Sequence, residues 1–160
     1  MRQVEDYKRK FLVFIDESTE CERAVAFAAY RVRRTGGTIV FLAVIDTADF
    51  QPFLGVEEVL RSEALHAAER LIDLRLGQVS RIADIKVETV IREGRAAEAV
   101  DALIREDKDI AILVLASSAA GDSPGELVTT FVTRGGASAL HIPVTIVPGG
   151  MSDAEIEAVC

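Results

Sequence analysis

Cysteine is scarce in this sequence, and long apolar runs are missing. Only two cysteines occur, Cys21 and Cys160, without the C-x-x-C spacing or the histidine cluster of a zinc site. Neither a disulfide framework nor a structural zinc is therefore predicted. No apolar stretch reaches the length of a membrane span or has the character of a signal peptide. We expect a protein of the reducing cytoplasm with no membrane partner.

The chain also lacks the excess of Lys and Arg that nucleic-acid binding requires. Its formal net charge is −8, whereas proteins that bind a phosphate backbone need clustered cations to release counterions. The basic run Lys8-Arg9-Lys10 precedes an apolar stretch and is interpreted as its solvated flank. No nucleic-acid partner is predicted.

Short apolar runs alternate with segments of helical periodicity along the whole chain. The runs cover residues 11–15, 38–45, 85–91, 110–115 and 144–147. Continuous runs of this length are typical of strands buried on both faces. A first helix is expected over 20–35, closed by Gly36-Gly37. A second is expected from 56 to about 80, although Gly77 could end that helix early, and a third between Gly94 and Asp107.

This alternation predicts an α/β fold with right-handed crossovers. We expect a single Rossmann-like domain over residues 8–148, in which an open five-stranded parallel sheet carries helices on both faces. Residues 149–160 follow Pro148 and are expected to form a flexible C-terminal tail. The connection over 46–55 contains Pro52 and is long enough to act as a lid or a partner surface.

Two sequence patterns predict helix starts. Thr19 with Glu22 matches a capping box, in which a hydroxyl and a carboxylate each accept a bond from a backbone N–H. Ser123-Pro124-Gly125-Glu126 matches a second one, with proline at the first position of a fourth helix. The alternative begins this helix near Thr129, whose amides and hydroxyls would then face an anion.

A ligand site is expected at one edge of the sheet. In open α/β sheets, ligands bind beyond the carboxyl ends of the strands, where the strand order reverses. The loops concerned cover residues 16–18, 46–47, 92–94 and 116–124. A receiver-type signalling domain would need a phosphorylatable aspartate after the third strand, where Arg92-Glu93-Gly94 stands.

The order of these features resembles the universal stress protein family. The matching pieces are the first strand with Asp16 and Ser18, the Glu93-Gly94 turn, and the strands over 113–116 and 141–147. The resemblance covers roughly residues 8–148. It implies the sheet order 3-2-1-4-5, a homodimer and a role in the stress response.

The family has members that bind ATP and members that do not. Nucleotide-binding members carry glycines that let backbone amides approach the phosphates. Here the positions of that motif hold Ala116 or Ser117, Ala119 or Ala120, and Thr129-Thr130 or Thr130-Phe131. Glu17 and Asp122 add negative charge there, which disfavours a triphosphate.

We therefore predict a non-enzymatic binding module that has lost the nucleotide. No Gly-x-Ser-x-Gly elbow, HExxH or Walker loop occurs. The alternative is a member that binds ATP or AMP with magnesium, helped by Arg134, and has at most weak hydrolase activity. For either ligand the resemblance implies the same candidate residues: Asp16, Ser18, Val44, Ser117, Ser118, Gly121, Thr129 and Thr130.

Some of these residues have simpler explanations. Asp16 equally suits a helix-entry turn, and Ser117 and Ser118 suit a tight turn. His66 and His141 have no carboxylate or cysteine at ligand spacing, so no metal site is predicted.

A homodimer interface is predicted at the last strand. If the sheet has the order 3-2-1-4-5, this strand is an edge, and unpaired edges invite strand addition by a second copy. The interface residues are then Val144, Thr145, Ile146 and Val147.

Overall fold

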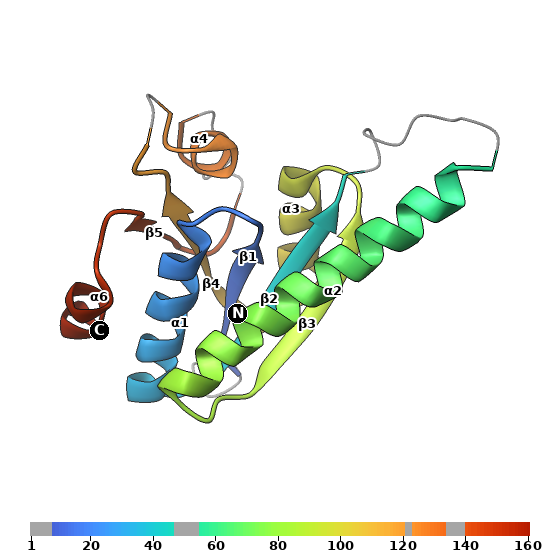
Figure 1. The fold of residues 1–160 in the computed structure, drawn as a ribbon. Coiled ribbons are helices and arrows are strands. Elements are labelled where there is room, and N and C mark those ends of the chain that lie inside the picture. The colour runs from blue at the N-terminus through green and yellow to red at the C-terminus, as the bar shows by residue number, and fades with distance from the viewer. Residues whose placement is uncertain (1–7, 47–54, 121–122, 134–139) are drawn as a thin grey trace.

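The sheet and its strand order are those predicted. The computed structural model describes residues 8–46, 55–120, 123–133 and 140–160. Five parallel strands lie in the order β3-β2-β1-β4-β5 (Figure 1). The strands are β1 (Lys10–Ile15), β2 (Thr38–Ile45), β3 (Val87–Glu93), β4 (Ile110–Ser117) and β5 (Val144–Pro148). The helices are α1 (Cys21–Thr35), α2 (Glu57–Ile82), α3 (Ala96–Glu106), α4 (Glu126–Thr133) and α6 (Asp153–Val159).

Helices cover both faces of the sheet because its central strands are apolar on both sides. In β1, Phe11, Val13 and Ile15 pack into the cluster formed with α1 and α2. Leu12 points the other way, into the cluster formed with α3 and α4. Leu12 and Val13 are both completely buried. Because all five strands run parallel, their carboxyl ends lie at one edge of the sheet.

The ends of the predicted helices are largely confirmed. The amide of Gly36 donates to the Val32 carbonyl at 2.8 Å, and Gly36 has a φ of 81°, which favours glycine. A Cβ on Gly37 would lie 2.6 Å from the Arg9 carbonyl oxygen. Helix α2 continues through Gly77 to Ile82, and its N-terminal half projects beyond the sheet (Figure 1). None of the helices described is both long and apolar enough to cross a bilayer.

Both predicted capping boxes are wrong. Helix α1 follows Glu20 with no side-chain cap, because a tight turn already pairs the amides of Cys21 and Glu22 with the carbonyls of Ser18 and Thr19. Helix α4 begins at Glu126, between the two predicted starts.

At α4, the residues of the predicted box instead form a loop. The carbonyl of Pro124 accepts from the Ser118 amide at 2.9 Å, so Pro124 belongs to that loop. Gly125, with a φ of 114°, then turns the chain into the helix.

Strand β3 lies two residues later than predicted. Its register pairs Val87 with Ile39 and Glu93 with Ile45. The sequence pattern stopped at Ile91 because Arg92 and Glu93 are polar. Both belong to the strand, since backbone pairing with β2 continues beyond the apolar alternation.

The C-terminal segment differs from the flexible tail that we expected. Helix α6 starts with a capping box in which Ser152 and Glu155 each accept a bond from the other's backbone N–H. Ile156 is completely buried and belongs to the same cluster as α1. Arg23 bonds the Met151 carbonyl and pairs with Asp153 at 2.8 Å. A cap, one apolar anchor and an ion pair thus hold a helix too short to show clear periodicity.

We expect Ile156→Ala to lower the free energy of unfolding by about 2–4 kcal/mol, because it removes the buried anchor of α6 and leaves a cavity. Urea denaturation followed by circular dichroism measures the change. Val159→Ala is the matched control on the same helix, since Val159 is 60% exposed, and should change stability by less than about 0.5 kcal/mol. Equal effects of the two substitutions would show that α6 does not pack on α1.

Candidate functional site

The turn that leaves β1 is organised by Asp16. Its Oδ1 accepts from the backbone N–H of Ser18 at 2.9 Å and also from the Ser18 hydroxyl. Asp16 therefore has the turn-forming role considered above. Because its carboxylate also lines two neighbouring pockets, it remains a candidate for ligand contact.

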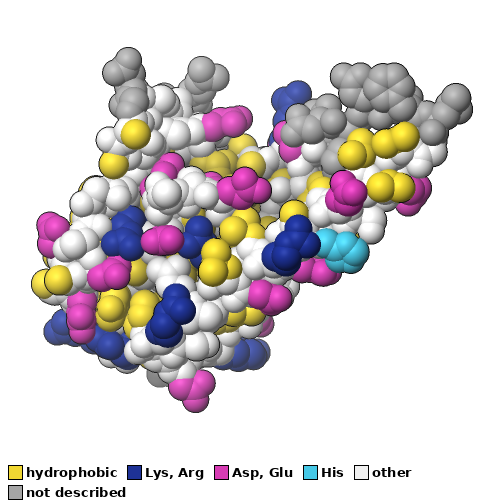
Figure 2. Space-filling view, in the orientation of Figure 1, with side chains coloured by type: hydrophobic (Ala, Val, Ile, Leu, Met, Phe, Trp, Pro, Cys, Tyr) yellow, Lys and Arg dark blue, Asp and Glu magenta, His cyan; other side chains and the backbone are white. Residues whose placement is uncertain are grey.

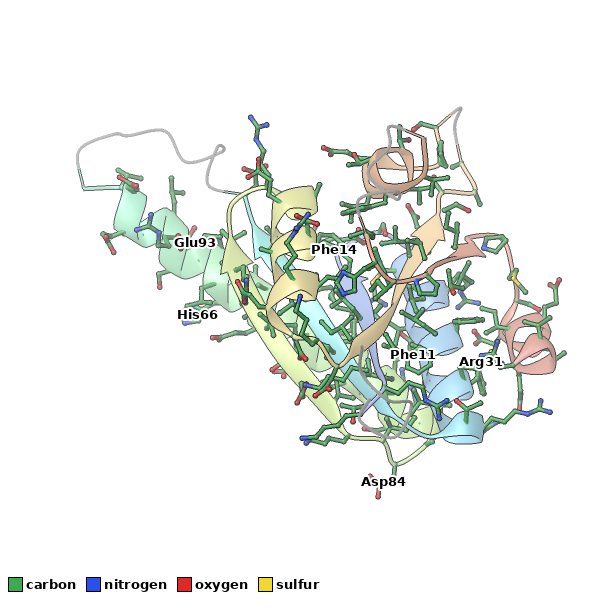
Figure 3. The ribbon with its side chains drawn as sticks, turned by 180° about the vertical axis from the view of Figure 1, so that it is seen from behind. Phe11, Phe14, Arg31, His66, Asp84 and Glu93 are labelled. Atoms are coloured by element: carbon green, nitrogen blue, oxygen red, sulfur yellow. The ribbon has the colours of Figure 1, made fainter. Side chains whose placement is uncertain are left out.

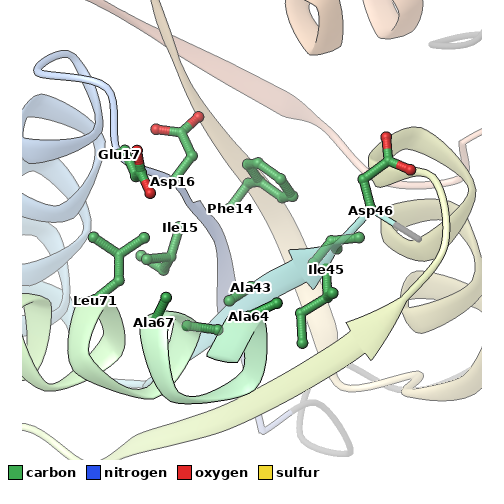
Figure 4. A pocket seen from close by; sticks show the side chains of 12 residues that line it. Phe14, Ile15, Asp16, Glu17, Ala43, Ile45, Asp46, Ala64, Ala67 and Leu71 are labelled. Carbon is green, nitrogen blue, oxygen red and sulfur yellow. The ribbon is translucent and has the colours of Figure 1, made fainter. Parts of the chain in front are cut away.

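The larger pocket lies at the carboxyl ends of β1 and β2, under α2. Its volume is about 380 Å³, within the range of roughly 300–1,000 Å³ typical of small-molecule sites. Figure 4 shows Asp16 and Glu17 at one end, Asp46 at the other, and Phe14 between them. The apolar walls come from the two strands and from α2, including Ile15, Ala43, Val44, Ile45, Ala64, Ala67, Ala68 and Leu71. Small side chains on α2 leave the space that the pocket occupies.

A smaller pocket of about 180 Å³ lies between β1 and β4, where the strand order reverses. It shares Phe14 and Asp16 with the larger pocket. Its other polar groups are Ser18, Glu20 and Glu126, and Ala116, Pro124 and Gly125 complete the wall beside the β4 loop.

The loop after β4 is bonded to itself and to the C-terminal segment. The Ser118 hydroxyl donates to the Ala120 carbonyl at 2.8 Å. On the other side, the Gly149 amide donates to the Ser117 carbonyl at 2.9 Å. A Cβ on Gly149 would overlap that carbonyl oxygen and press on the Ala119 amide. The loop is therefore packed against residues 149–150.

The two pockets bring together only part of the predicted residues. Asp16, Ser18 and Val44 line them, whereas Ser117, Ser118, Thr129 and Thr130 are not among their lining residues. Gly121, Asp122, Arg134 and residues 47–54 lie outside the described part of the chain.

Phe14 and Glu20 also line the pockets, although neither was predicted from the sequence. Phe14 is the last large apolar residue before Asp16 on the face away from Ile15, a signal that strand alternation could have given. Glu20 directly precedes α1, and no sequence pattern connected it with a ligand.

Arg75 is the other residue that the sequence did not reveal. It is a charged side chain of α2 with only 4% of its surface exposed. Its Nη2 donates to the Ser18 carbonyl at 3.4 Å, and its Nη1 lies 3.6 Å from a Glu22 oxygen. Arg75 therefore connects α2 to the turn that carries Asp16.

Nothing in the described residues gathers ligands for a metal. No group of three or more His, Cys, Asp or Glu side chains is placed to hold an ion within residues 8–46, 55–120, 123–133 and 140–160. His66 lies exposed on α2 (Figure 3), and His141 is exposed before β5.

An open, doubly wound α/β sheet with pockets at the carboxyl edge of its strands defines a class of small-ligand-binding folds. The sequence model of the universal stress protein family matches residues 8–148. The chain therefore belongs to the universal stress protein family. A comparison with curated protein sequences finds no match.

Solved structures agree on the fold at low sequence identity. Universal stress protein UspA from Lactobacillus plantarum is 16% identical, with a TM-score of 0.72 over 88% of this chain and 98% of that one. A universal stress protein from Archaeoglobus fulgidus in complex with dAMP is 12% identical, with a TM-score of 0.58 over 88% of this chain and 97% of that one. A universal stress protein family protein from Arabidopsis thaliana with AMP bound is 14% identical, with a TM-score of 0.61 over 88% of this chain and 91% of that one.

Burial sets the reactivity of the thiol beside the smaller pocket. It raises the pKa of the Cys21 thiol from its ordinary value near 9 to about 11, although Arg75 acts in the opposite direction. Burial also raises the pKa of Cys160. At pH 8 Cys21 should hold about a hundredfold less thiolate than an unfolded cysteine.

We therefore expect the native protein to react slowly with Ellman's reagent at pH 8 and rapidly in urea. Because the folded pKa of Cys21 is the higher one, its contribution to stability is complete below pH 9 and lost as the pH rises through about 11. Cys21→Ala should flatten this alkaline decrease in a series of urea titrations. A fast-reacting Cys21 in the native protein would contradict its burial.

Proposed function

We propose that this chain is a non-catalytic binding module of the cytoplasm, acting in the stress response, whose pockets take a small ligand without a polyphosphate. One observation carries the proposal. Five carboxylates line the two pockets, and none of the described lining residues is Lys, Arg or His. The five are Asp16, Glu17, Glu20, Asp46 and Glu126.

The repulsion between these carboxylates and a polyphosphate is expected to exceed the attraction that the helix end offers. Two like charges 4 Å apart repel by about 4 kcal/mol at an effective dielectric constant of 20. The amides at a helix N-terminus attract an anion by only about 0.3–1 kcal/mol. Glu126 also sits in the first turn of α4, where it already interacts with that helix end. The attraction at the one helix end that faces the smaller pocket therefore does not offset the repulsion from several carboxylates.

Steric contacts support the same conclusion. Ala116 lines the smaller pocket, where a glycine would let backbone amides approach a phosphate. The loop beyond it is held by Gly149 and by its own Ser118 bonds. An incoming phosphate would have to displace this packed segment.

An adenine mononucleotide is the second candidate ligand. The relatives titled as complexes with AMP and dAMP favour it, as does a universal stress protein structure in complex with cAMP, 16% identical to this chain with a TM-score of 0.59. The larger pocket is wide enough for a small molecule and has apolar walls suited to a flat ring. This alternative includes binding of ATP with magnesium, with at most weak hydrolase activity.

Calorimetric titration with adenosine, AMP and ATP, the nucleotides with magnesium, separates these candidates. We expect affinity to fall with each added phosphate and ATP to give no binding heat. Neutralising Glu20 and Glu126 together, as Glu20→Gln with Glu126→Gln, should raise AMP affinity about fivefold or more by removing repulsion.

Asp84→Asn is the control, because Asp84 lies at the opposite end of the sheet (Figure 3), and it should leave the affinities unchanged. Micromolar binding of ATP to the unaltered protein would refute the proposal. AMP binding tighter than adenosine would favour the second candidate.

We further propose that two copies associate through the open edge of β5. Among the described strands, β5 pairs only with β4. The Pro143 carbonyl and the Gly149 amide both bond β4. In a strand, the backbone N–H and C=O of every second residue point to the same neighbouring strand. The backbone groups of Thr145 therefore also face β4, and the amides of Val144 and Ile146 face the open edge.

We expect Ile146→Pro to lower the dimer fraction in light scattering, since it removes an amide from the open edge. Ile146→Ala keeps that amide and is the matched control, which should remain dimeric. Circular dichroism shows whether each variant is folded. A dimer mass unchanged by the proline would exclude pairing through β5.

A further inference from the structure

A groove between α1 and α2 forms a third cavity, away from the carboxyl edge of the sheet. Its volume is about 310 Å³. Helix α1 contributes Glu22, Arg23 and Tyr30, helix α2 contributes Leu74, Arg75, Gln78, Arg81 and Ile82, and Asp153 of α6 closes one end. Lys or Arg and Asp or Glu side chains lie beside one another over α1 and the C-terminal half of α2 (Figure 2). Asp153 lies beyond residues 8–148, so the family match does not account for this end of the groove.

Arg75 brings unused hydrogen-bonding capacity to the groove. A guanidinium has five N–H donors, and burying a charge is costly unless it is well paired. The contacts of Arg75 with Ser18 and Glu22 are long, at 3.4 and 3.6 Å. Its Nε is buried without a hydrogen-bond partner. The existing partners therefore satisfy this cation poorly.

Gln78 leaves a complementary acceptor one turn further along α2. Its Nε2 donates to the Glu22 carbonyl at 2.8 Å, which fixes the amide. Its Oε1 is buried and has no hydrogen-bond partner. A donor in Arg75 and an acceptor in Gln78 thus lie close together on one helix face.

The Glu22 side chain shows which group suits this position. Its carboxylate lies between two arginines, 3.5 Å from Arg23 Nη2 and 3.6 Å from Arg75 Nη1. Both distances exceed those of a close charge-assisted hydrogen bond. The Glu22 side chain is 52% exposed and can turn outward into solvent. A ligand carboxylate could then form the shorter bonds that Glu22 does not.

The remaining walls of the groove define the body of such a ligand. Tyr30, Leu74 and Ile82 provide apolar surface, and Leu74 is 59% exposed. Arg81 adds a third cation at the rim. Among the described lining residues, three are arginines and two, Glu22 and Asp153, are acidic, so the groove carries a net positive charge on a chain of net charge −8.

We propose that this groove binds a small organic acid with an apolar body and an N–H or O–H donor next to its carboxylate, such as an N-acyl amino acid or a peptide C-terminus. The carboxylate accepts from Arg75 and Arg81, and the neighbouring donor bonds Gln78 Oε1. The apolar body covers Leu74 and Tyr30. This site shares no lining residue with the two pockets at the carboxyl edge.

The test uses N-acetylphenylalanine, its uncharged amide and inorganic phosphate as probes of the full chain. Titrations are followed by ¹H–¹⁵N NMR at the Arg75 Nε–H, the Gln78 side-chain amide and the backbone of Tyr30. We expect saturable shifts at millimolar concentrations with the acid only. Arg81→Gln should weaken binding about two- to fivefold. Gln78→Met should also weaken it while leaving all charges in place.

Arg70→Gln is the matched control, because Arg70 is exposed on α2 and does not line the groove, and it should not change the affinity. Equal binding of acid and amide would overturn the proposal, since the carboxylate would then have no role. Phosphate binding as strong as that of the acid, or the absence of saturable shifts, would also overturn it. These outcomes do not depend on the nucleotide titrations at the other site.

Discussion

The burial of the central strands on both faces is the constraint on which the rest of the structure depends. Because β1 and β4 carry apolar side chains on each side, helices must cover the sheet twice, and the chain crosses over in the same sense after every strand. Order 3-2-1-4-5 then opens a gap between neighbouring helices beside the end of β1. The position of the candidate site is therefore a consequence of packing, whatever residues stand there.

The residues at that edge decide what the position can bind. Asp16 shapes its own turn and faces both pockets, so one side chain affects local structure and ligand choice together. The other carboxylates come from the residue after β2, from α4 and from the turn before α1, and are brought together only by the fold. A family fold that elsewhere accompanies nucleotides thus presents an acidic edge in this chain.

The sequence was sufficient for the fold and for part of the site. Strand alternation and the Gly36 stop follow from local chemistry, and the structure agrees with them. The capping box failed at Thr19 because a backbone turn supplied the partners that the pattern assigned to side chains. It failed at Ser123 because that hydroxyl accepts from the Gly125 amide, in the loop before α4 begins. The docking of α6 and the burial of Arg75 depend on contacts between distant segments, which no local pattern contains. The hydroxyls of the β4 loop were candidates by resemblance, yet Ser118 bonds its own turn.

The contact between Arg75 and the Ser18 carbonyl has a thermodynamic consequence. One guanidinium belongs both to the groove between α1 and α2 and to the turn that holds Asp16. Any ligand that draws Arg75 away from Ser18 changes the free energy of that turn, and with it the affinity of the pockets that Asp16 lines. By reciprocity, a ligand at Asp16 must alter affinity in the groove by the same factor. The groove and the two pockets at Asp16 would then respond as one cooperative unit.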